Sequence, residues 1–178
     1  MSNPPLFKSF WMAGYEGACH INESGKRLDM TAFVQHDRQV EQDYALLPGV
    51  GIEAARESVR WPLIERSGHF DYSSITPMLK AANDHGIQLI WTLCHYGWPE
   101  EIEVFSTVFV DSFARFCGNV ARFIGEHSNA VPYYNPINEI SFLSWAICHT
   151  GLMYPYASQG GKCAMCCCVL PGIPLSKQ

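Results

Sequence analysis

The stretch Ile87-Gln88-Leu89-Ile90-Trp91-Thr92-Leu93-Cys94 is a nearly continuous apolar run with the length of a single β-strand. Such a run is typical of a parallel strand buried on both faces, because a half-exposed strand alternates apolar and polar residues. The preceding residues, 71–85, carry apolar side chains at helical spacing and end at Gly86, a common helix terminator. A helix that leads directly into a buried strand indicates a parallel α/β sheet.

The same alternation extends in both directions along the chain. Upstream, the sequence predicts a strand over residues 6–14, a helix over 31–47 and a second strand over about 53–59. Downstream, the apolar stripe of residues 107–126 predicts a long helix, and residues 131–137 predict a fourth strand. Successive strand-then-helix units imply right-handed crossovers, so we expect an α/β fold with a parallel sheet in one domain.

The charge and hydropathy patterns exclude several functional classes. The 178-residue chain carries 12 Lys and Arg against 17 Asp and Glu, which gives a formal net charge of -5. Because no basic stripe is present, we expect no nucleic-acid partner. No apolar run is long enough to cross a bilayer and residues 1–8 lack a signal-peptide pattern, so we expect no membrane association and a cytoplasmic location.

The C-terminal residues 160–178 differ in character from the rest, and we treat residues 1–159 as the folded domain. This irregular tail holds four crowded cysteines, Cys163, Cys166, Cys167 and Cys168. The spacing of Cys163 and Cys166 suits a zinc site, but a second pair of ligands is missing. The favoured interpretation is that the reading frame was lost near Lys162 or that the gene was cut there.

Unusual polar and aromatic residues stand at the predicted carboxyl ends of the strands. They are Glu16 after the first strand, Arg56 and Arg60 in the second, His95 and Trp98 after the third, and Asn138 and Glu139 after the fourth. In parallel α/β folds these ends meet at one rim, where the functional groups lie. Taken singly, each is more often structural, as an ion-paired charge, a satisfied core histidine or a core tryptophan. Their coincidence on one rim favours a functional site.

Four stretches carry a resemblance to a known family. Residues 56–62, Arg-Glu-Ser-Val-Arg-Trp-Pro, are similar to a second-strand Arg-x-Ser-x-x-Trp-Pro pattern, and residues 92–99 to a third-strand Thr-Leu-x-His-Trp-Asp-x-Pro pattern. Residues 133–139 end in a fourth-strand Asn-Glu motif, and residues 10–17 match an opening Gln-x-Glu-Gly segment more weakly. In this order, over residues 6–155, they resemble the N-terminal half of the retaining β-glycosidases of the β-glucosidase type, glycoside hydrolase family 1 and its clan.

The resemblance implies a truncated TIM (β/α)8 barrel made of about the first four β/α units. A closed barrel of this type usually needs about 250 residues, more than this chain has. A half barrel exposes the edges of its first and fourth strands, so we expect self-association through these edges.

The resemblance also implies roles for particular residues in an O-glycosyl hydrolase. It makes Glu139 the general acid/base, Asn138 the partner of the sugar 2-hydroxyl, and Arg56 a partner of the catalytic nucleophile. The residues that would bind the substrate, a β-linked sugar or an aryl or alkyl glycoside, are Glu16, His95, Trp98 and Trp145. No metal or cofactor is needed, because a retaining enzyme works with two carboxyl groups.

Departures from the family pattern leave the substrate open. Tyr96 and Gly97 stand where the family usually has Trp and Asp, and Tyr15-Glu16-Gly17 lacks the usual Gln that reads sugar hydroxyls. The family's nucleophile is a Glu near the end of strand seven, and no residue of this chain can be nominated for that role. We therefore expect the isolated chain to have little or no glycosidase activity.

Two other functions compete with this interpretation. One is a non-catalytic carbohydrate-binding half barrel, in which His95, Trp98 and Trp145 contact a sugar without turnover. The other, which is less favoured, is a metal-binding or redox protein built on the C-terminal cysteines.

Overall fold

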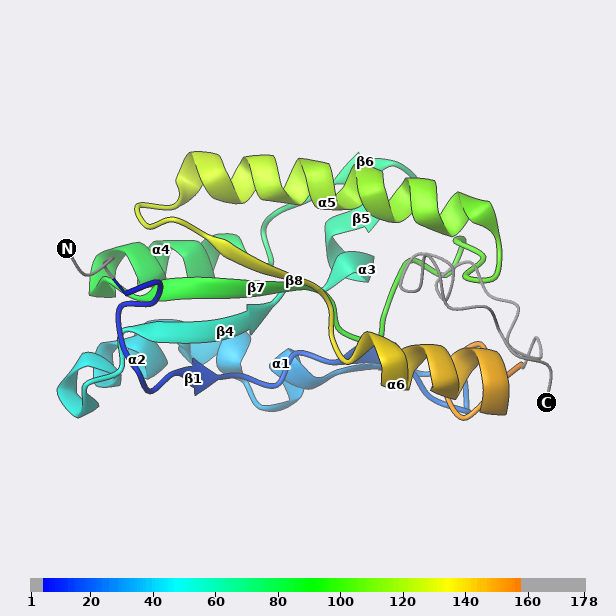
Figure 1. Cartoon of the computed structure of the whole chain (residues 1–178), viewed down its shortest axis with the longest axis horizontal. Helices are drawn as coiled ribbons and strands as arrows, with labels where there is room; N and C mark the ends of the chain where they lie inside the picture. Colours follow the sequence, from blue (N-terminus) through cyan, green and yellow to red (C-terminus); the bar gives the residue numbers. More distant parts are fainter. Residues whose placement is uncertain (1–4, 158–178) are drawn as a thin grey trace.

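A parallel four-stranded sheet forms the centre of the computed structural model, which describes residues 5–157 (Figure 1). Its strands, in spatial order, are β1 (Ala13–Gly14), β4 (Ala54–Ser58), β7 (Gln88–Cys94) and β8 (Tyr133–Ile137). Every neighbouring pair in this sheet is parallel. The predicted α/β class with a parallel sheet is therefore confirmed.

The strand β7 is buried along nearly its whole length, as its apolar sequence predicts. Only Ile90 within it is less than fully buried. The strand pairs with β4 on one edge and with β8 on the other. Helix α4 (Thr76–His85) leads into β7 and ends at Gly86, whose φ of 68° is accessible to glycine without steric cost.

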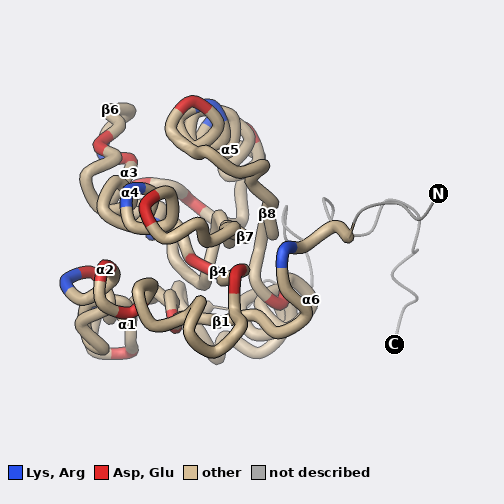
Figure 2. The backbone as a smooth tube through the Cα atoms, turned by 90° about the vertical axis from the view of Figure 1, so that its left-hand side faces the viewer, with Lys and Arg blue, Asp and Glu red and all other residues tan. Residues whose placement is uncertain are grey.

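The longer helices cover one side of the sheet. Figure 2 shows α2 (His36–Leu46), α4 and α5 (Thr107–His127) following one another along this side. Between them and the sheet lies an apolar core whose largest fully buried side chains include Trp61 and Phe116. The Trp61 ring stacks on the Phe116 ring of α5 with ring centroids 4.7 Å apart. The apolar stripe that predicted the long helix is thus its core-facing side.

Two predicted elements near the N-terminus are shortened or interrupted. The strand predicted over residues 6–14 forms only at the two residues of β1. The helix predicted over residues 31–47 is divided into α1 (Met30–Phe33) and α2. The break occurs because Gln35 has a φ of 62°, which a right-handed helix cannot contain.

Short elements without a periodic signal fill the connections. Helix α4 begins later than the predicted residue 71, because the Asp71 carboxylate accepts a hydrogen bond from Ser73 N at 2.8 Å and forms a turn. The further elements are the hairpin β2 (Cys19–Ile21) with β3 (Arg27–Asp29), the hairpin β5 (Glu65–Arg66) with β6 (His69–Phe70), the helices α3 (Trp61–Ile64) and α6 (Ile140–Ser144), a 3-10 turn at Pro48–Val50 and a π-helical turn at Trp145–Thr150.

A buried polar cluster joins α2 to β4. His36 Nε2 lies 2.8 Å from Glu57 Oε1, and His36 Nδ1 lies 2.5 Å from Asp43 Oδ2. The Tyr44 hydroxyl donates to the same Glu57 oxygen at 2.5 Å, and the Tyr15 ring stacks on the His36 ring at 3.7 Å. Burial lowers the pKa of His36, but hydrogen bonds to the two carboxylates and their charges outweigh it and raise the pKa overall.

Two features that bear on function are absent from the described part of the chain. None of the helices within residues 5–157 has the length and apolar character needed to span a membrane. Among the same residues, no group of three or more His, Cys, Asp or Glu side chains could hold a metal ion. The cysteine-rich tail from Cys163 to Cys168, with its predicted zinc spacing, lies outside the described residues.

Two glycines allow close contacts around the ends of the strands. A Cβ on Gly97, in the loop after β7, would lie 1.7 Å from the carbonyl oxygen of Cys19 in β2. A Cβ on Gly17 would lie 2.1 Å from the Cβ of Ser58 at the end of β4. The hairpin β2–β3 therefore packs directly on the backbone of the loop after β7, and only glycine fits at position 97.

Replacement of Gly97 by alanine tests this contact. Because the new Cβ must displace the Cys19 backbone, we expect Gly97→Ala to lower the free energy of unfolding by about 2 kcal/mol or more. The matched control is Gly118→Ala, since Gly118 lies inside α5 with nothing within 4 Å of an added Cβ. There, alanine is expected to raise the free energy of unfolding by up to about 1 kcal/mol. Urea unfolding measures both values, and similar values for the two variants would contradict the packing.

Candidate active site

A cleft of about 610 Å³ lies at the carboxyl ends of the sheet strands. It is lined by Glu16, Ala18, His20, Met30, Arg56, His95, Tyr96, Asn138, Glu139, Phe142 and Met153. Five of the residues predicted from the sequence are therefore brought together, namely Glu16, Arg56, His95, Asn138 and Glu139. They come from the ends of all four strands, as expected for a parallel α/β fold.

Arg56 connects three neighbouring strands beneath the cleft. It lies in β4, and its Nε donates to Thr92 Oγ1 of β7 at 3.1 Å. Its Nη2 donates to Asn138 Oδ1 at 2.5 Å. Asn138 follows β8 directly and is held by its own backbone, whose N–H donates to the Cys94 carbonyl at 2.9 Å. The guanidinium and the amide are thus fixed relative to each other by the sheet itself.

Tyr96 links Asn138 to Glu139. Asn138 Nδ2 donates to the Tyr96 hydroxyl at 2.8 Å, and that hydroxyl donates to Glu139 Oε2. The sequence marked Tyr96 only as a departure from the family pattern. Its position directly after His95, at the end of a buried strand, is the one signal that placed it near the site.

The backbone is strained at both ends of the Tyr96–Glu139 contact. Tyr96 has a φ of 64° and Glu139 has a φ of 43°, both in the left-handed region. This conformation costs a residue with a side chain about 1 to 2 kcal/mol. Such strain concentrates at functional sites, where the surrounding structure holds it in place. Here it directs the two side chains toward each other at the rim.

His95 and Glu16 form the other polar group of the cleft. His95 Nδ1 lies 3.1 Å from Ser58 Oγ, and His95 Nε2 lies 3.7 Å from Glu16 Oε1. The same Glu16 oxygen accepts a hydrogen bond from Ala18 N at 2.8 Å, which fixes the carboxylate. Burial lowers the pKa of His95, although the charge of Glu16 opposes it, so the ring is predominantly neutral at pH 7.

The electrostatics of the cleft also act on Tyr96. Burial, together with the hydrogen bond to Glu139 and the charge of Glu139, raises the pKa of Tyr96 to about 12. Tyr96 therefore keeps its proton at neutral pH and acts as a hydrogen-bond donor to Glu139. The cleft combines one guanidinium, two carboxylates, the two imidazoles of His20 and His95, an amide and a phenol, which is a set suited to binding several hydroxyl groups.

Two predicted substrate-binding tryptophans do not line this cleft. Trp98 is 2% exposed and packs in the core, with its ring edge-on to Phe109 at 5.7 Å. The structure thus favours a core role for Trp98 over a sugar contact, because the ring is surrounded by core side chains and has almost no exposed surface. Trp145 is 48% exposed and lies beside Phe142, with ring centroids 6.0 Å apart. Phe142 itself lines the cleft, although the sequence did not single it out.

Arg60 also lies apart from the cleft. Its side chain is buried, and its Nη1 donates to the Asp29 carboxylate at 2.8 Å. These contacts support a structural role for Arg60, as an ion-paired charge at the end of a strand.

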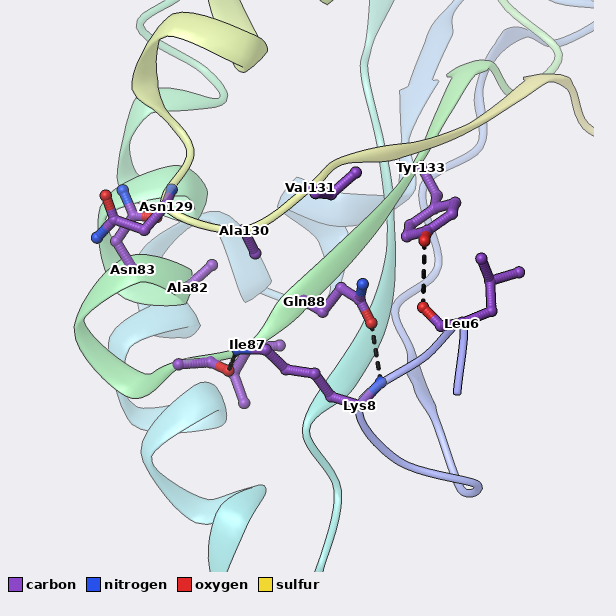
Figure 3. A pocket seen from close by; sticks show the side chains of 11 residues that line it. Leu6, Lys8, Ala82, Asn83, Ile87, Gln88, Asn129, Ala130, Val131 and Tyr133 are labelled. Carbon is purple, nitrogen blue, oxygen red and sulfur yellow. Dashed lines mark hydrogen bonds between the residues drawn. The ribbon is translucent and has the colours of Figure 1, made fainter. Parts of the chain in front are cut away.

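A second cavity, of about 330 Å³, lies at the opposite ends of β7 and β8 (Figure 3). Lys8 spans its edge, donating from its backbone N–H to Gln88 Oε1 at 3.0 Å and from Nζ to the Gly86 carbonyl at 2.9 Å. The Tyr133 hydroxyl donates to the Leu6 carbonyl at 3.2 Å. Among the described residues that line this cavity, Lys8 alone is charged, so they include no paired acid and base for catalysis.

The parallel sheet, the helices on one side and the polar cleft at the carboxyl ends define the structural class of this chain, that of part of a TIM (β/α)8 barrel. No protein-family model matches the chain, and no curated protein sequence matches it. Solved structures do match. The truncated-barrel fold and the resemblance to β-glycosidases, both predicted from the sequence, are confirmed at the level of the fold.

Three of these solved structures illustrate the extent of the match. A psychrophilic β-glucosidase from Micrococcus antarcticus has a TM-score of 0.69 and 16% identity, over 85% of this chain and 38% of that one. The AHE enzyme from Alicyclobacillus herbarius has a TM-score of 0.67 and 19% identity, over 89% and 40%. A family 1 β-glucosidase from Thermotoga maritima has a TM-score of 0.59 and 19% identity, over 67% and 28%. At these identities the likeness shows the fold alone, and this chain spans less than half the length of each.

The pKa values of the two buried histidines His95 and His36 are expected to be shifted in opposite directions from the ordinary value. The pKa of His95 is lowered below its ordinary value of 6.5, whereas that of His36 is raised above it. As the pH falls below 6.5, the unfolded chain binds a proton before His95 does, so the stability from neutral His95 is lost. The stability from protonated His36 is present below pH 6.5 and is lost as the pH rises through its raised pKa.

An NMR titration of the imidazole carbons measures both pKa values in one sample. Assignment by His95→Gln and His36→Gln variants identifies the two signals. A His95 signal that titrates at or above the His36 signal would contradict the burial and partners described for these rings.

Proposed function

We propose that this chain carries the acid/base part of a site that hydrolyses β-glycosides, with Glu139 as the general acid/base. The observation that supports this most is the hydrogen-bonded series of Arg56, Asn138, Tyr96 and Glu139 at the carboxyl ends of three neighbouring parallel strands. Working residues of (β/α)8 enzymes come from these strand ends. In addition, the sequence resemblance assigns proton transfer to Glu139, the second residue of the Asn138-Glu139 pair that follows β8.

Each residue then has a chemical task. Glu139 gives a proton to the glycosidic oxygen as the bond from that oxygen to the anomeric carbon breaks and this carbon bonds to a nucleophilic carboxylate that the described residues do not supply. Glu139 later takes a proton from the water that displaces this carboxylate. Asn138 donates to the 2-hydroxyl of the sugar, a hydrogen bond that strengthens as positive charge develops on the ring. Arg56 orients Asn138 through the contact described above and adds a positive charge beside the place where the nucleophile would lie.

Glu16 is assigned to binding. It is the second carboxylate that lines the cleft, but one of its oxygens already accepts from Ala18 N and faces His95. A nucleophile must instead be free to form a bond with the anomeric carbon. Glu16 offers a carboxylate oxygen to sugar hydroxyls, and the neutral His95 ring beside it offers a polar ring atom. Phe142 and Met153 supply apolar contact for the sugar ring.

The ligand proposed is a β-linked sugar carrying an aryl or alkyl group. Among the matched structures is a complex of the virulence factor SghA with the substrate analog of that protein, salicin, which is an aryl glucoside. Salicin is therefore a suitable probe for this chain. The competing function, carbohydrate binding without turnover, uses the same cleft and differs only in the absence of product.

Calorimetric titration with salicin tests binding in this cleft. We expect measurable binding, and a dissociation constant about tenfold larger for Asn138→Ala, because one hydrogen bond to the sugar is lost. The matched control is Asn129→Ala, an asparagine that lines the second cavity, and it is expected to bind salicin as the unchanged chain does. Absence of binding by the unchanged chain, or equal weakening by both variants, would contradict the proposed site.

An assay with 4-nitrophenyl β-glucoside separates hydrolysis from binding. We expect little or no product, because a retaining mechanism needs a second carboxyl group about 5 to 5.5 Å from the first that is free to attack. Product that is formed by the unchanged chain and lost in Glu139→Gln would overturn this expectation while supporting the acid/base assignment. Product that persists in Glu139→Gln would remove Glu139 from that role.

A further inference from the structure

The Tyr96 hydroxyl stands at the one position in the cleft that joins Asn138 to Glu139. It accepts from Asn138 Nδ2 at 2.8 Å and donates to Glu139 Oε2. We propose that this hydroxyl takes the place of a sugar hydroxyl in the ligand-free cleft, so that Tyr96 competes with the ligand and selects for sugars that can displace it. This inference rests on the proposed function, because it concerns the same sugar-binding groups.

The direction of the hydrogen bonds supports the competition. Arg56 donates to Asn138 Oδ1, Asn138 donates to Tyr96, and Tyr96 donates to Glu139. A group at the Tyr96 position must therefore accept from an amide and donate to a carboxylate at once. A hydroxyl does both through a single oxygen atom, and this holds for a sugar hydroxyl as it does for a phenol.

The surroundings of the Tyr96 ring allow it to leave this position. The ring is half-buried and lies edge-on to His95 at 4.8 Å, with Phe142 at 6.0 Å on another side. His95 and Phe142 both line the cleft, so the ring borders open space rather than only the apolar core. The ring packs against the apolar core on one side and lines the cleft on the other, so the cleft is the side toward which it can turn away from Asn138.

If a ligand must displace the Tyr96 hydroxyl, the cleft selects for sugars that carry a hydroxyl group at this position. A sugar that presents a hydroxyl to Asn138 and Glu139 replaces both hydrogen bonds that Tyr96 gives up. A sugar without that hydroxyl leaves either Tyr96 in place or the amide and carboxylate unpaired, which costs affinity. Under the proposed function this hydroxyl is the 2-hydroxyl, so the 2-deoxy analogue of salicin is the matched probe.

Calorimetry on Tyr96→Phe tests the competition, because this change removes the hydroxyl and keeps the ring. We expect the variant to bind salicin about tenfold more tightly than the unchanged chain, since the ligand no longer displaces two hydrogen bonds. Binding of 2-deoxysalicin is expected to change much less. The matched control is Tyr133→Phe, which removes a hydroxyl at the second cavity and is expected to leave salicin binding unchanged.

The outcomes separate this inference from the proposed function. Binding by the unchanged chain that becomes tighter in Tyr96→Phe supports both. Binding by the unchanged chain that is equal or weaker in Tyr96→Phe overturns the competition and leaves the proposed function standing. Absence of heat in both proteins overturns the proposed function, and the competition with it.

A measurement on the unchanged chain decides the question even if Tyr96→Phe does not fold. NMR of tyrosine labelled at the ring carbon Cζ reports the ionisation of each phenol. The Tyr96 signal is expected to titrate near the raised pKa of about 12, and at lower pH once salicin replaces the contact with Glu139. Glu139→Gln removes the negative charge and is expected to lower the Tyr96 pKa, whereas Glu16→Gln is expected to affect it less. A Tyr96 signal that responds to neither salicin nor Glu139→Gln overturns the inference.

Discussion

The guanidinium of Arg56 is a charge set within a parallel sheet, and the arrangement of the cleft depends on how that charge is paired. A charged group in such a place needs hydrogen-bond partners from adjacent strands, because solvent reaches it only in part. Thr92 supplies one partner from β7 and Asn138 supplies the other from the end of β8. The amide of Asn138 is thereby turned so that its nitrogen faces Tyr96, and the orientation of Glu139 follows from that of Tyr96. One partly buried charge thus orders the polar side of the site.

The parts of the fold that the sequence predicted are those decided by burial. β7, α4 and α5 each show an apolar pattern over a whole element, and the structure has all three near the predicted positions. The parts that escaped prediction depend on single residues or on contacts between distant segments. Gln35 interrupts a periodic helix by its backbone conformation, and the hairpin of β2 and β3 is too short to show any period.

The same distinction applies to the candidate site. Glu16, Arg56, His95, Asn138 and Glu139 could be predicted, because a polar residue at the end of a buried parallel strand is unusual and the strand ends converge. The role of Tyr96 could not be predicted, since it depends on hydrogen bonds of its hydroxyl with Asn138 and Glu139, which lie at the end of another strand. The opposite case is Trp98, whose residue type suggests a sugar platform, whereas in the structure it is buried among apolar residues. Residue type predicts what a side chain can do, and packing decides whether it is free to do it.

The tight fit at Gly97 has a consequence for how this cleft could change. The carbonyl of Cys19 occupies the space that any side chain at position 97 would need, so the hairpin cannot move independently of the loop after β7. An acidic residue cannot be introduced at position 97 without moving the hairpin, and the segment that carries Glu16 leads directly into that hairpin. Under the proposed function, ligand preference is therefore tied to hairpin geometry, and exchanging the pair Tyr96-Gly97 for Trp-Asp would require replacement of the whole β2–β3 segment rather than a pair of substitutions.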